Sequence, residues 1–147
     1  MVVKSLIQRV TRAQVTVKGV TVGAIERGLL VFVGLESADD TSSVERMAER
    51  ILGYRVFPDD TGRMNRSVRD IGGGVLLVSQ FTLAADTRKG TRASFSPAAD
   101  PEVARRLYEQ LVAAVRTCHA DVATGQFAAD MQVALVNDGP VTFLLET

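Results

Sequence analysis

The stretch that most constrains the fold is an unbroken apolar run at residues 28–35, Gly-Leu-Leu-Val-Phe-Val-Gly-Leu. A strand without alternating polar residues is buried on both faces, so this run predicts a central strand of a covered sheet. Two β-branched triplets precede it at residues 15–17 and 20–22, and Lys18-Gly19 joins them, which predicts a tight hairpin. The first 35 residues therefore predict several strands of one sheet, mostly antiparallel.

Two segments have the apolar spacing of amphipathic helices. Asp39 or Thr41 caps the first, whose apolar stripe occupies positions 44, 47, 48, 51 and 52. Asp100-Pro101 begins the second, whose stripe ends at Cys118 as a core residue. Further strands are expected at residues 54–57, 75–78, 131–136 and 141–145, and a loop or short ribbon at 59–74. With no internal repeat or interdomain linker, the pattern predicts a single α+β domain over residues 1–147, a mostly antiparallel sheet with two main helices packed on it.

Charge and cysteine usage narrow the functional classes. The chain carries 17 basic and 17 acidic side chains, a formal net charge of zero. This balance argues against charge-driven binding to long nucleic acid, and no DNA partner is expected, whereas one end of an RNA needs only a few phosphate contacts. The single cysteine, Cys118, and the single histidine, His119, exclude an intrachain disulfide, an all-cysteine metal site and a histidine-rich metal centre. We therefore expect neither a metal nor a cofactor.

The start of the chain indicates its compartment. Residues 1–6, Met-Val-Val-Lys-Ser-Leu, enter a strand pattern without a long hydrophobic run or a cleavage site, so no signal peptide is expected. With glycine left out of the count, the longest unbroken apolar stretches have about five residues, far short of the ~20 that span a bilayer. We expect a cytoplasmic protein without membrane contact.

A cluster of polar and aromatic groups directly follows the predicted strand at residues 75–78. Three glycines precede that strand, and Ser79, Gln80, Phe81 and Thr82 follow it. A rigid strand that delivers polar side chains to its own end is a common way to build a site. The alternative is a strand that ends in an ordinary turn, which the local pattern alone favours.

Covalent catalysis by Ser79 or Thr82 needs a base within hydrogen-bond reach of the hydroxyl. The only histidine, His119, lies at the end of the second predicted helix, so a Ser-His-Asp triad requires that helix end to meet the strand end. The loop aspartates are sufficiently explained by turn chemistry. What remains is a site of backbone N–H groups and neutral side chains. Such a site can stabilise an oxyanion when the substrate brings its own reactive hydroxyl.

Two other features each have two readings. Gly139-Pro140, between the last two predicted strands, is either an ordinary turn or a rigid dipeptide that presents its carbonyl groups as a steric and hydrogen-bonding gauge. Arg88, Lys89 and Arg92 lie in the polar segment after the candidate site, where they either contact phosphate or form an ordinary basic loop.

The two motifs together resemble the signature motifs of the D-aminoacyl-tRNA deacylases. The first runs from Ser79 to Leu83 and the second from Asn137 to Thr142, about 55 residues apart. Gln8-Arg9-Val10, the Met64-Asn65 segment and the predicted strand order are also similar, so the resemblance covers essentially the whole chain. Each motif alone is weak, but both at this spacing in a chain of this size are specific.

The resemblance implies a homodimer of small β-barrel-like subunits with helices packed on the sheet and active sites at the subunit interface. It implies hydrolysis of the ester that joins a D-amino acid, or glycine mischarged on tRNA-Ala, to the 3′-terminal adenosine of tRNA. It further implies that Gly139-Pro140 is cis and enters the partner's pocket, where an L side chain would meet its carbonyl groups and be excluded.

The same resemblance assigns the candidate site residues. Ser79, Gln80, Phe81 and Thr82 line the pocket and hold the ester and its oxyanion, while the 2′-hydroxyl of the terminal ribose assists the attack. The residues implied in substrate binding are Gly139, Pro140, Asn137, Thr142, Arg9 and Met64. Two alternatives stay open: a non-catalytic barrel that binds a small ligand or the acceptor end of tRNA, and a conventional serine or cysteine hydrolase that uses His119.

Overall fold

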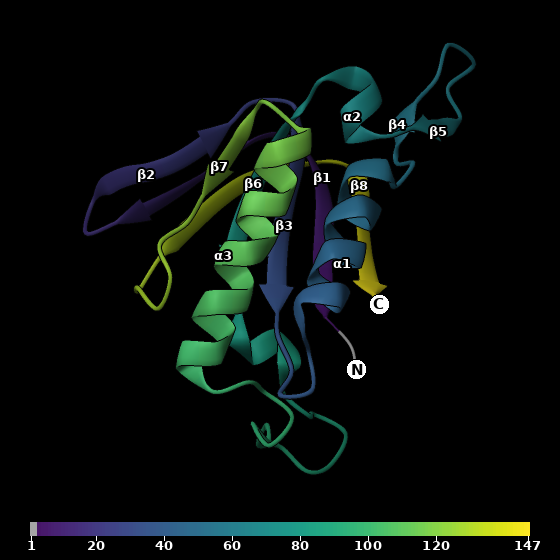
Figure 1. Cartoon of the computed structure of the whole chain (residues 1–147). Coiled ribbons are helices and arrows are strands. Elements are labelled where there is room, and N and C mark those ends of the chain that lie inside the picture. Colours follow the sequence, from purple (N-terminus) through teal and green to yellow (C-terminus); the bar gives the residue numbers. More distant parts are fainter. Residues whose placement is uncertain (1–2) are drawn as a thin grey trace.

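One long, bent strand, β1 (Lys4–Val17), organises the sheet in the computed structural model, which describes residues 3–147 (Figure 1). It pairs antiparallel with β2 (Val20–Ile25), β3 (Gly28–Gly34) and β8 (Gln132–Glu146). The sheet continues from β3 through parallel partners β6 (Gly74–Ser79) and β7 (Val122–Thr124). A separate antiparallel ribbon consists of β4 (Phe57–Pro58) and β5 (Met64–Arg66).

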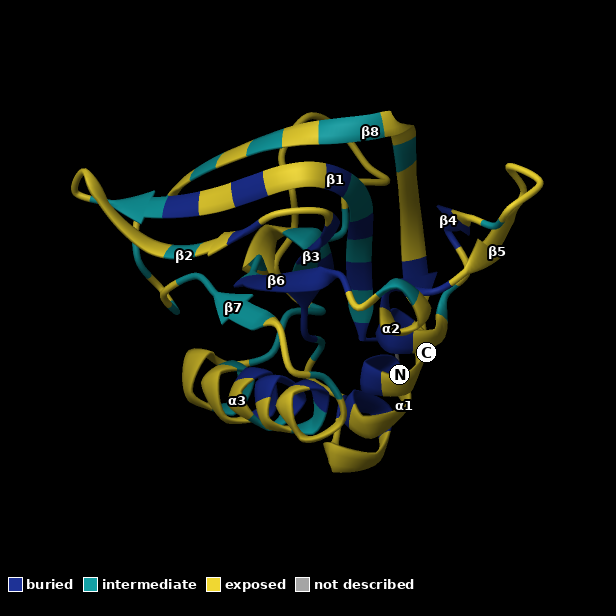
Figure 2. Ribbon diagram, turned by 90° about the horizontal axis from the view of Figure 1, so that it is seen from above, coloured by how far each residue is buried: buried dark blue, intermediate teal, exposed yellow. Residues whose placement is uncertain are grey.

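The two long helices cover one face of this sheet, and two short ones lie at the strand ends. They are α1 (Thr41–Gly53), the short α2 (Val68–Ile71), the 3₁₀ helix η1 (Phe81–Ala84) and α3 (Pro101–Cys118). Figure 2 shows α1 and α3 on one face of β3 and β6, with the bent pair β1–β8 arching over the other. Close approach of β2 to β7 makes the sheet barrel-like, since a Cβ on Gly23 would lie 2.2 Å from the carbonyl oxygen of Thr124.

The apolar run at residues 28–35 is buried on both faces, as predicted. Leu29, Val31 and Val33 belong to the core cluster beneath the helices. Leu30 faces the opposite way, into a second cluster with Leu76 of β6 and residues of the bent β1. These two apolar layers hold the β3–β6 pair in place, so the ends of both strands are fixed points in the fold.

The predicted fold class, a barrel-like sheet with helices packed on it, is confirmed, but the sheet is mixed rather than mostly antiparallel. The two parallel pairs arise because α1 and α3 each return the chain to the end of the sheet where the preceding strand began. Sequence periodicity indicates strands and helices but does not reveal which way a strand enters the sheet after a helix.

Several local predictions are confirmed. The β1–β2 hairpin turns at Lys18 and Gly19, both with positive φ. Helix α1 forms as predicted, but its cap is Asp40 rather than Asp39 or Thr41, and the Asp40 side chain accepts a hydrogen bond from the N–H of Ser43. The segment 59–74 contains the expected ribbon and also α2, which is too short to show helical periodicity.

Three further predictions are corrected. The strand expected at residues 54–57 is reduced to the two-residue β4, which begins only at Phe57. The strands expected at residues 131–136 and 141–145 form one continuous strand, β8, which bends between them. Cys118 is exposed rather than a core residue, because the buried stripe of α3 ends at Val115, one turn earlier. Within the described residues, no helix is both long and apolar enough to cross a membrane.

Candidate active site

The first motif lies where β6 leaves the sheet. Ser79 is the last residue of β6 and pairs with Val33 of β3. The N–H of Gln80 still donates to the carbonyl oxygen of Val33 (2.7 Å), after which the chain turns into η1. Because the first N–H groups of a helix have no partner within it, Phe81 and Thr82 offer backbone donors at this point. The strand end therefore presents a backbone geometry suited to an oxyanion.

The side chains of this motif are only partly engaged with one another. The amide of Gln80 donates to the hydroxyl of Thr82 (2.6 Å), and Thr82 is exposed. The ring of Phe81 is 64% exposed and packs against Phe95, with ring centroids 5.4 Å apart. Since the Thr82 hydroxyl accepts from an amide, this contact does not supply a base that would remove its proton.

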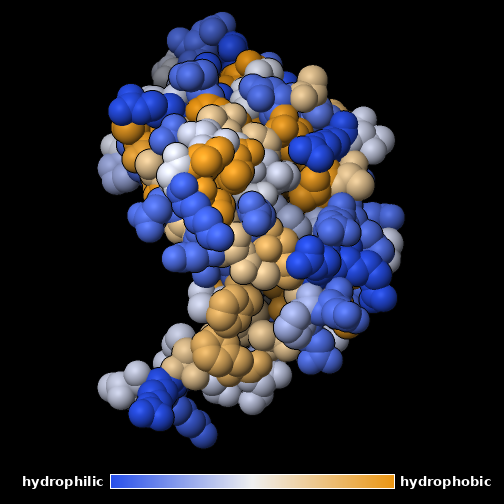
Figure 3. All heavy atoms as spheres, turned by 90° about the vertical axis from the view of Figure 1, so that its left-hand side faces the viewer, coloured by the Kyte–Doolittle hydropathy of each residue, from blue (hydrophilic) through white to orange (hydrophobic). Residues whose placement is uncertain are grey.

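An apolar cavity of about 480 Å³ opens beside the motif. Ser79, Gln80 and Phe81 form one wall, and the start of α3 and residues 127–133 form the others. Figure 3 shows apolar residues gathered on this side of the molecule, surrounded by hydrophilic ones. A cavity of this size and composition, with a few polar groups at one wall, is the usual form of a small-molecule or nucleoside site.

Tyr108, which sequence reasoning missed, holds β6, the strand that leads into this site. Its hydroxyl donates to the carbonyl oxygen of Leu77 (2.8 Å), which also accepts from the N–H of Gly125 (2.9 Å). Burial raises the pKa of Tyr108, so the hydroxyl stays a donor. In the sequence, Tyr108 is only a tyrosine within the apolar stripe of a predicted helix. That pattern does not identify its hydrogen-bond partner, Leu77, 31 residues away.

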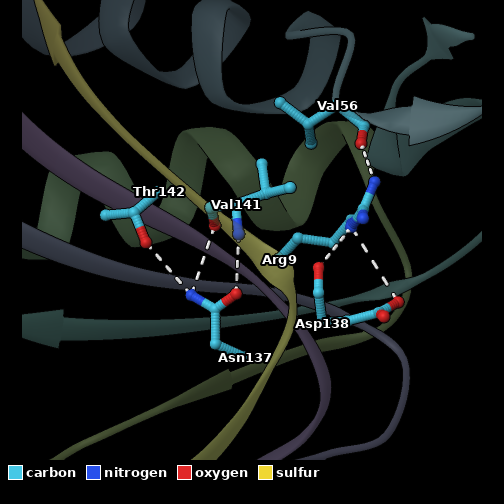
Figure 4. Close-up of polar contacts among 6 residues, drawn as sticks. All are labelled: Arg9, Val56, Asn137, Asp138, Val141 and Thr142. Carbon is cyan, nitrogen blue, oxygen red and sulfur yellow. Dashed lines mark hydrogen bonds and ion pairs between the residues drawn. The ribbon is translucent and has the colours of Figure 1, made fainter.

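The second motif lies at the bend of β8 and is held from two sides (Figure 4). Asn137 accepts from the N–H of Val141 (2.7 Å) and donates to the hydroxyl of Thr142 (3.0 Å), closing the bend. The Gly139-Pro140 peptide bond within the bend is cis. Asn137 therefore acts here as a structural bracket for the dipeptide.

Arg9 of β1 holds the other side of the bend. Its guanidinium donates to the carbonyl oxygen of Asp138 (2.8 Å) and to that of Val56 (2.6 Å), and it lies 3.8 Å from the Asp138 carboxylate. The side chain is only 13% exposed. Gly139 leaves room for it, because a Cβ there would lie 3.1 Å from an Arg9 nitrogen. Arg9 thus ties three distant segments together at the Gly-Pro bend.

The structure does not bring the two motifs together within one chain. Ser79 pairs with Val33, whereas Arg9 pairs with Leu29, four residues earlier on β3. At about 3.3 Å per residue this is roughly 13 Å along the strand, and β8 lies on the far side of β1 from β3. Met64, on the β4–β5 ribbon, is also at the Gly-Pro end of the molecule (Figure 1).

His119 lies far from the first motif. Its Nε2 contacts the carbonyl oxygen of Gly73 (2.6 Å), just before β6 begins, whereas Ser79 ends the strand. Six extended residues separate these points by roughly 20 Å. Within one chain, His119 is therefore not a base for Ser79 or Thr82.

The loop carboxylates have the turn roles expected of them. Hydrogen bonds from the side chains of Thr61 and Asn65 hold the pKa of Asp59 well below its usual range. Hydrogen bonds from Arg88 lower the pKa of Asp86 to about 2. Among residues 3–147, no group of three or more histidine, cysteine or acidic side chains is arranged to hold a metal ion.

Similarity to known proteins places the chain in a class of hydrolases that act on the ester of aminoacyl-tRNA. Residues 6–146 match the family described as D-Tyr-tRNA(Tyr) deacylase. A D-aminoacyl-tRNA deacylase of Methylococcus capsulatus is 65% identical over 141 residues, covering 96% of this chain and 92% of the relative. One from Alcanivorax borkumensis is 64% identical over 143 residues, covering 97% and 99%.

Solved structures agree on the fold. A protein described as c-Myc DNA Unwinding Element Binding Protein superposes with a TM-score of 0.94 at 40% identity, covering 98% of each chain. A probable eukaryotic D-amino acid tRNA deacylase superposes with a TM-score of 0.87 over the full length of both chains, and its 16% identity shows the fold alone. The chain belongs to the D-aminoacyl-tRNA deacylase family.

The Arg9 contacts generate a prediction about stability. Lysine cannot donate from a planar fork to two carbonyl oxygens, so Arg9→Lys should lower the free energy of unfolding by roughly 1–3 kcal/mol and reduce deacylation. Urea unfolding at fixed protein concentration measures the first effect. The matched control, Arg12→Lys, changes an exposed arginine of the same strand and should stay within about 0.5 kcal/mol of the parent. Equal unfolding midpoints for both variants would contradict the bracing role of Arg9.

Proposed function

We propose that this protein hydrolyses the ester between a D-amino acid and the 3′-terminal adenosine of tRNA and rejects L-amino acids by means of Gly139-Pro140. The observation that carries the proposal is the bracing of the Gly-Pro bend. Asn137 closes the bend and Arg9 pins it to β1 and to Val56, so its carbonyl groups have fixed positions. A fixed backbone wall can discriminate by shape, which an adaptable loop cannot.

The active site in this proposal forms between two copies of the chain. The two motifs lie at different ends of the β3 register in one chain, so a pocket that uses both needs the Gly-Pro bend of a second copy. A homodimer with two equivalent sites meets this requirement. In each site, the end of β6 belongs to one subunit and the bend of β8 to the other.

Chirality would be read at the α-carbon. With the α-amino group held by the Gly-Pro carbonyl oxygens, a D side chain points away from the dipeptide and an L side chain points into it. Glycine has no side chain to exclude, so a glycyl ester, including one mischarged on tRNA-Ala, enters as well. Selection of this kind rejects the wrong enantiomer without recognising the right one, so many D-amino acids are accepted.

The chemistry would need little from side chains. Water attacks the ester carbonyl carbon, the carbonyl oxygen becomes an oxyanion held by backbone N–H groups near Phe81, and the C–O bond to the ribose 3′ oxygen breaks. The 2′-hydroxyl of the same ribose activates the attacking water: it accepts a proton from the water and passes its own proton to the departing 3′ oxygen, so the products are the free amino acid and tRNA with its 3′-hydroxyl restored. Ser79, Gln80 and Thr82 position the ester, Met64 contacts the substrate, and the reaction takes place in the cytoplasm where tRNA is charged.

The runner-up is a barrel that binds nucleic acid or a small ligand without turnover. One solved relative is described as binding a DNA unwinding element, and this favours testing nucleic acid binding separately. A formal net charge of zero gives little general attraction to long DNA. Binding of tRNA without release of amino acid would favour this second function.

The proposal predicts a large enantiomer preference. D-tyrosyl-tRNA should be hydrolysed faster than L-tyrosyl-tRNA by at least a factor on the order of 100, because only the L side chain meets the Gly-Pro wall. Release of free tyrosine from both substrates, at equal enzyme concentration and corrected for spontaneous hydrolysis, measures the ratio. Equal rates, or no release from either substrate, would overturn the proposed function.

The role of the ribose hydroxyl gives a second prediction. D-tyrosyl-tRNA ending in 2′-deoxyadenosine should react slower by a factor on the order of 10² to 10⁴, the usual contribution of such proton-transfer assistance.

The Thr82→Ala variant, measured on the normal substrate, should keep its rate within about 10-fold of the parent, since loss of a true nucleophile costs on the order of 10⁶. Full activity on the deoxy substrate, or a near-complete loss in Thr82→Ala, would reject the RNA-assisted route.

A further inference from the structure

A closed ribbon projects from the molecule beside the first motif. Asp86 and Ser94 exchange two backbone hydrogen bonds (2.8 and 2.9 Å), which close the chain between them into a loop. In Figure 1 this segment projects below η1, and Figure 3 shows an apolar region at its base and hydrophilic atoms at its tip. We call residues 86–94 the basic ribbon, since they contain three cations and one carboxylate.

The three cations of the basic ribbon have different environments. Arg88 forms a two-pronged pair with Asp86, with its Nε and Nη2 at 2.9 and 3.0 Å from the carboxylate oxygens. Within residues 3–147, Lys89 and Arg92 form no ion pair, and both are exposed. Arg88 therefore neutralises the one carboxylate and shapes the ribbon, which leaves Lys89 and Arg92 as its available positive charges.

An aromatic contact connects the basic ribbon to the candidate site. Phe95, directly after the ribbon, packs on Phe81 of the first motif, and both rings are about half exposed or more. Ser37 and Ala99 add backbone hydrogen bonds that hold the return of this segment to the body of the protein. The positive tip thus has a defined place at the side of the cavity where Phe81 lies.

We propose that Lys89 and Arg92 bind phosphate groups of the RNA strand whose 3′ end enters the cavity, with Arg88 holding the ribbon in shape. This inference rests on the proposed function and names the residues that recognise the rest of the tRNA. The RNA backbone just upstream of a terminal nucleoside carries regularly spaced negative charges, and exposed lysine and arginine side chains bind them without reading sequence. The ribbon therefore distinguishes a tRNA ester from an ester on a free nucleoside.

The test compares Lys89→Ala/Arg92→Ala with the parent on two substrates, D-tyrosyl-tRNA and D-tyrosyl-adenosine, which lacks upstream phosphates. The double variant should raise KM for the tRNA ester on the order of 10-fold and leave kcat unchanged. The slope of log affinity for uncharged tRNA against log salt concentration should become shallower by about 1 to 2. Hydrolysis of D-tyrosyl-adenosine should be unaffected.

The control variant is Arg46→Ala/Arg116→Ala, which removes two exposed cations from the helices and should behave like the parent in every assay. An unchanged KM and salt slope in the Lys89/Arg92 variant would overturn the inference, and so would an equal loss of hydrolysis on both substrates. In either case, hydrolysis by the parent protein would leave the proposed function standing. Absence of hydrolysis by the parent protein would instead overturn the proposed function, and the salt slope would still report on the ribbon.

Discussion

The fold depends on the close parallel pairing of β3 with β6 between two apolar layers. The strands approach so closely at their first residues that a Cβ on Gly28 would lie 1.9 Å from the carbonyl oxygen of Gly74. Leu29 and Val31 on one face and Leu30 and Leu76 on the other are fully buried, so most of this pair is shielded from solvent. Because this packing fixes the position of the strand pair, it also fixes the positions of Ser79 at the end of β6 and of the first N–H groups of η1.

The Gly-Pro bend is fixed by different physics, through hydrogen bonds to charged and amide side chains rather than apolar burial. Arg9 reaches the bend because its strand, β1, pairs with β8 as well as with β3. Both motifs are thus rigidly held but do not meet in one chain, and in the proposed function they are the two halves of a site shared by two subunits. Neither half-site contains a conventional nucleophile with its base, which fits a reaction in which the RNA contributes a hydroxyl.

The sequence predicted the parts of this account that local pattern or motif chemistry determines. The run at residues 28–35, the Lys18-Gly19 turn and the stripes of α1 and α3 each carry their own periodicity or turn signal. The parallel direction of β6, the exposure of Cys118 and the contact of Tyr108 with Leu77 depend on packing between distant segments, which leaves no local trace. The contacts of Arg9 and Asn137 also depend on packing. Both residues were recognisable as parts of motifs, but only the folded structure shows that their partners are Val56, Asp138 and Val141.

In the proposed function each active site combines the β6 end of one subunit with the β8 bend of another, and this can be tested by mixing two variants, each first shown to lack D-tyrosyl-tRNA deacylation on its own. Gln80→Ala impairs one half-site and Pro140→Ala the other. Unfolded together and refolded as a mixture, they form mixed dimers in which one of the two sites has both halves intact. D-tyrosyl-tRNA deacylation should return to about a quarter of the parental level, the share expected for random pairing of two subunit types in two-site dimers. A mixture as inactive as either variant alone would contradict it.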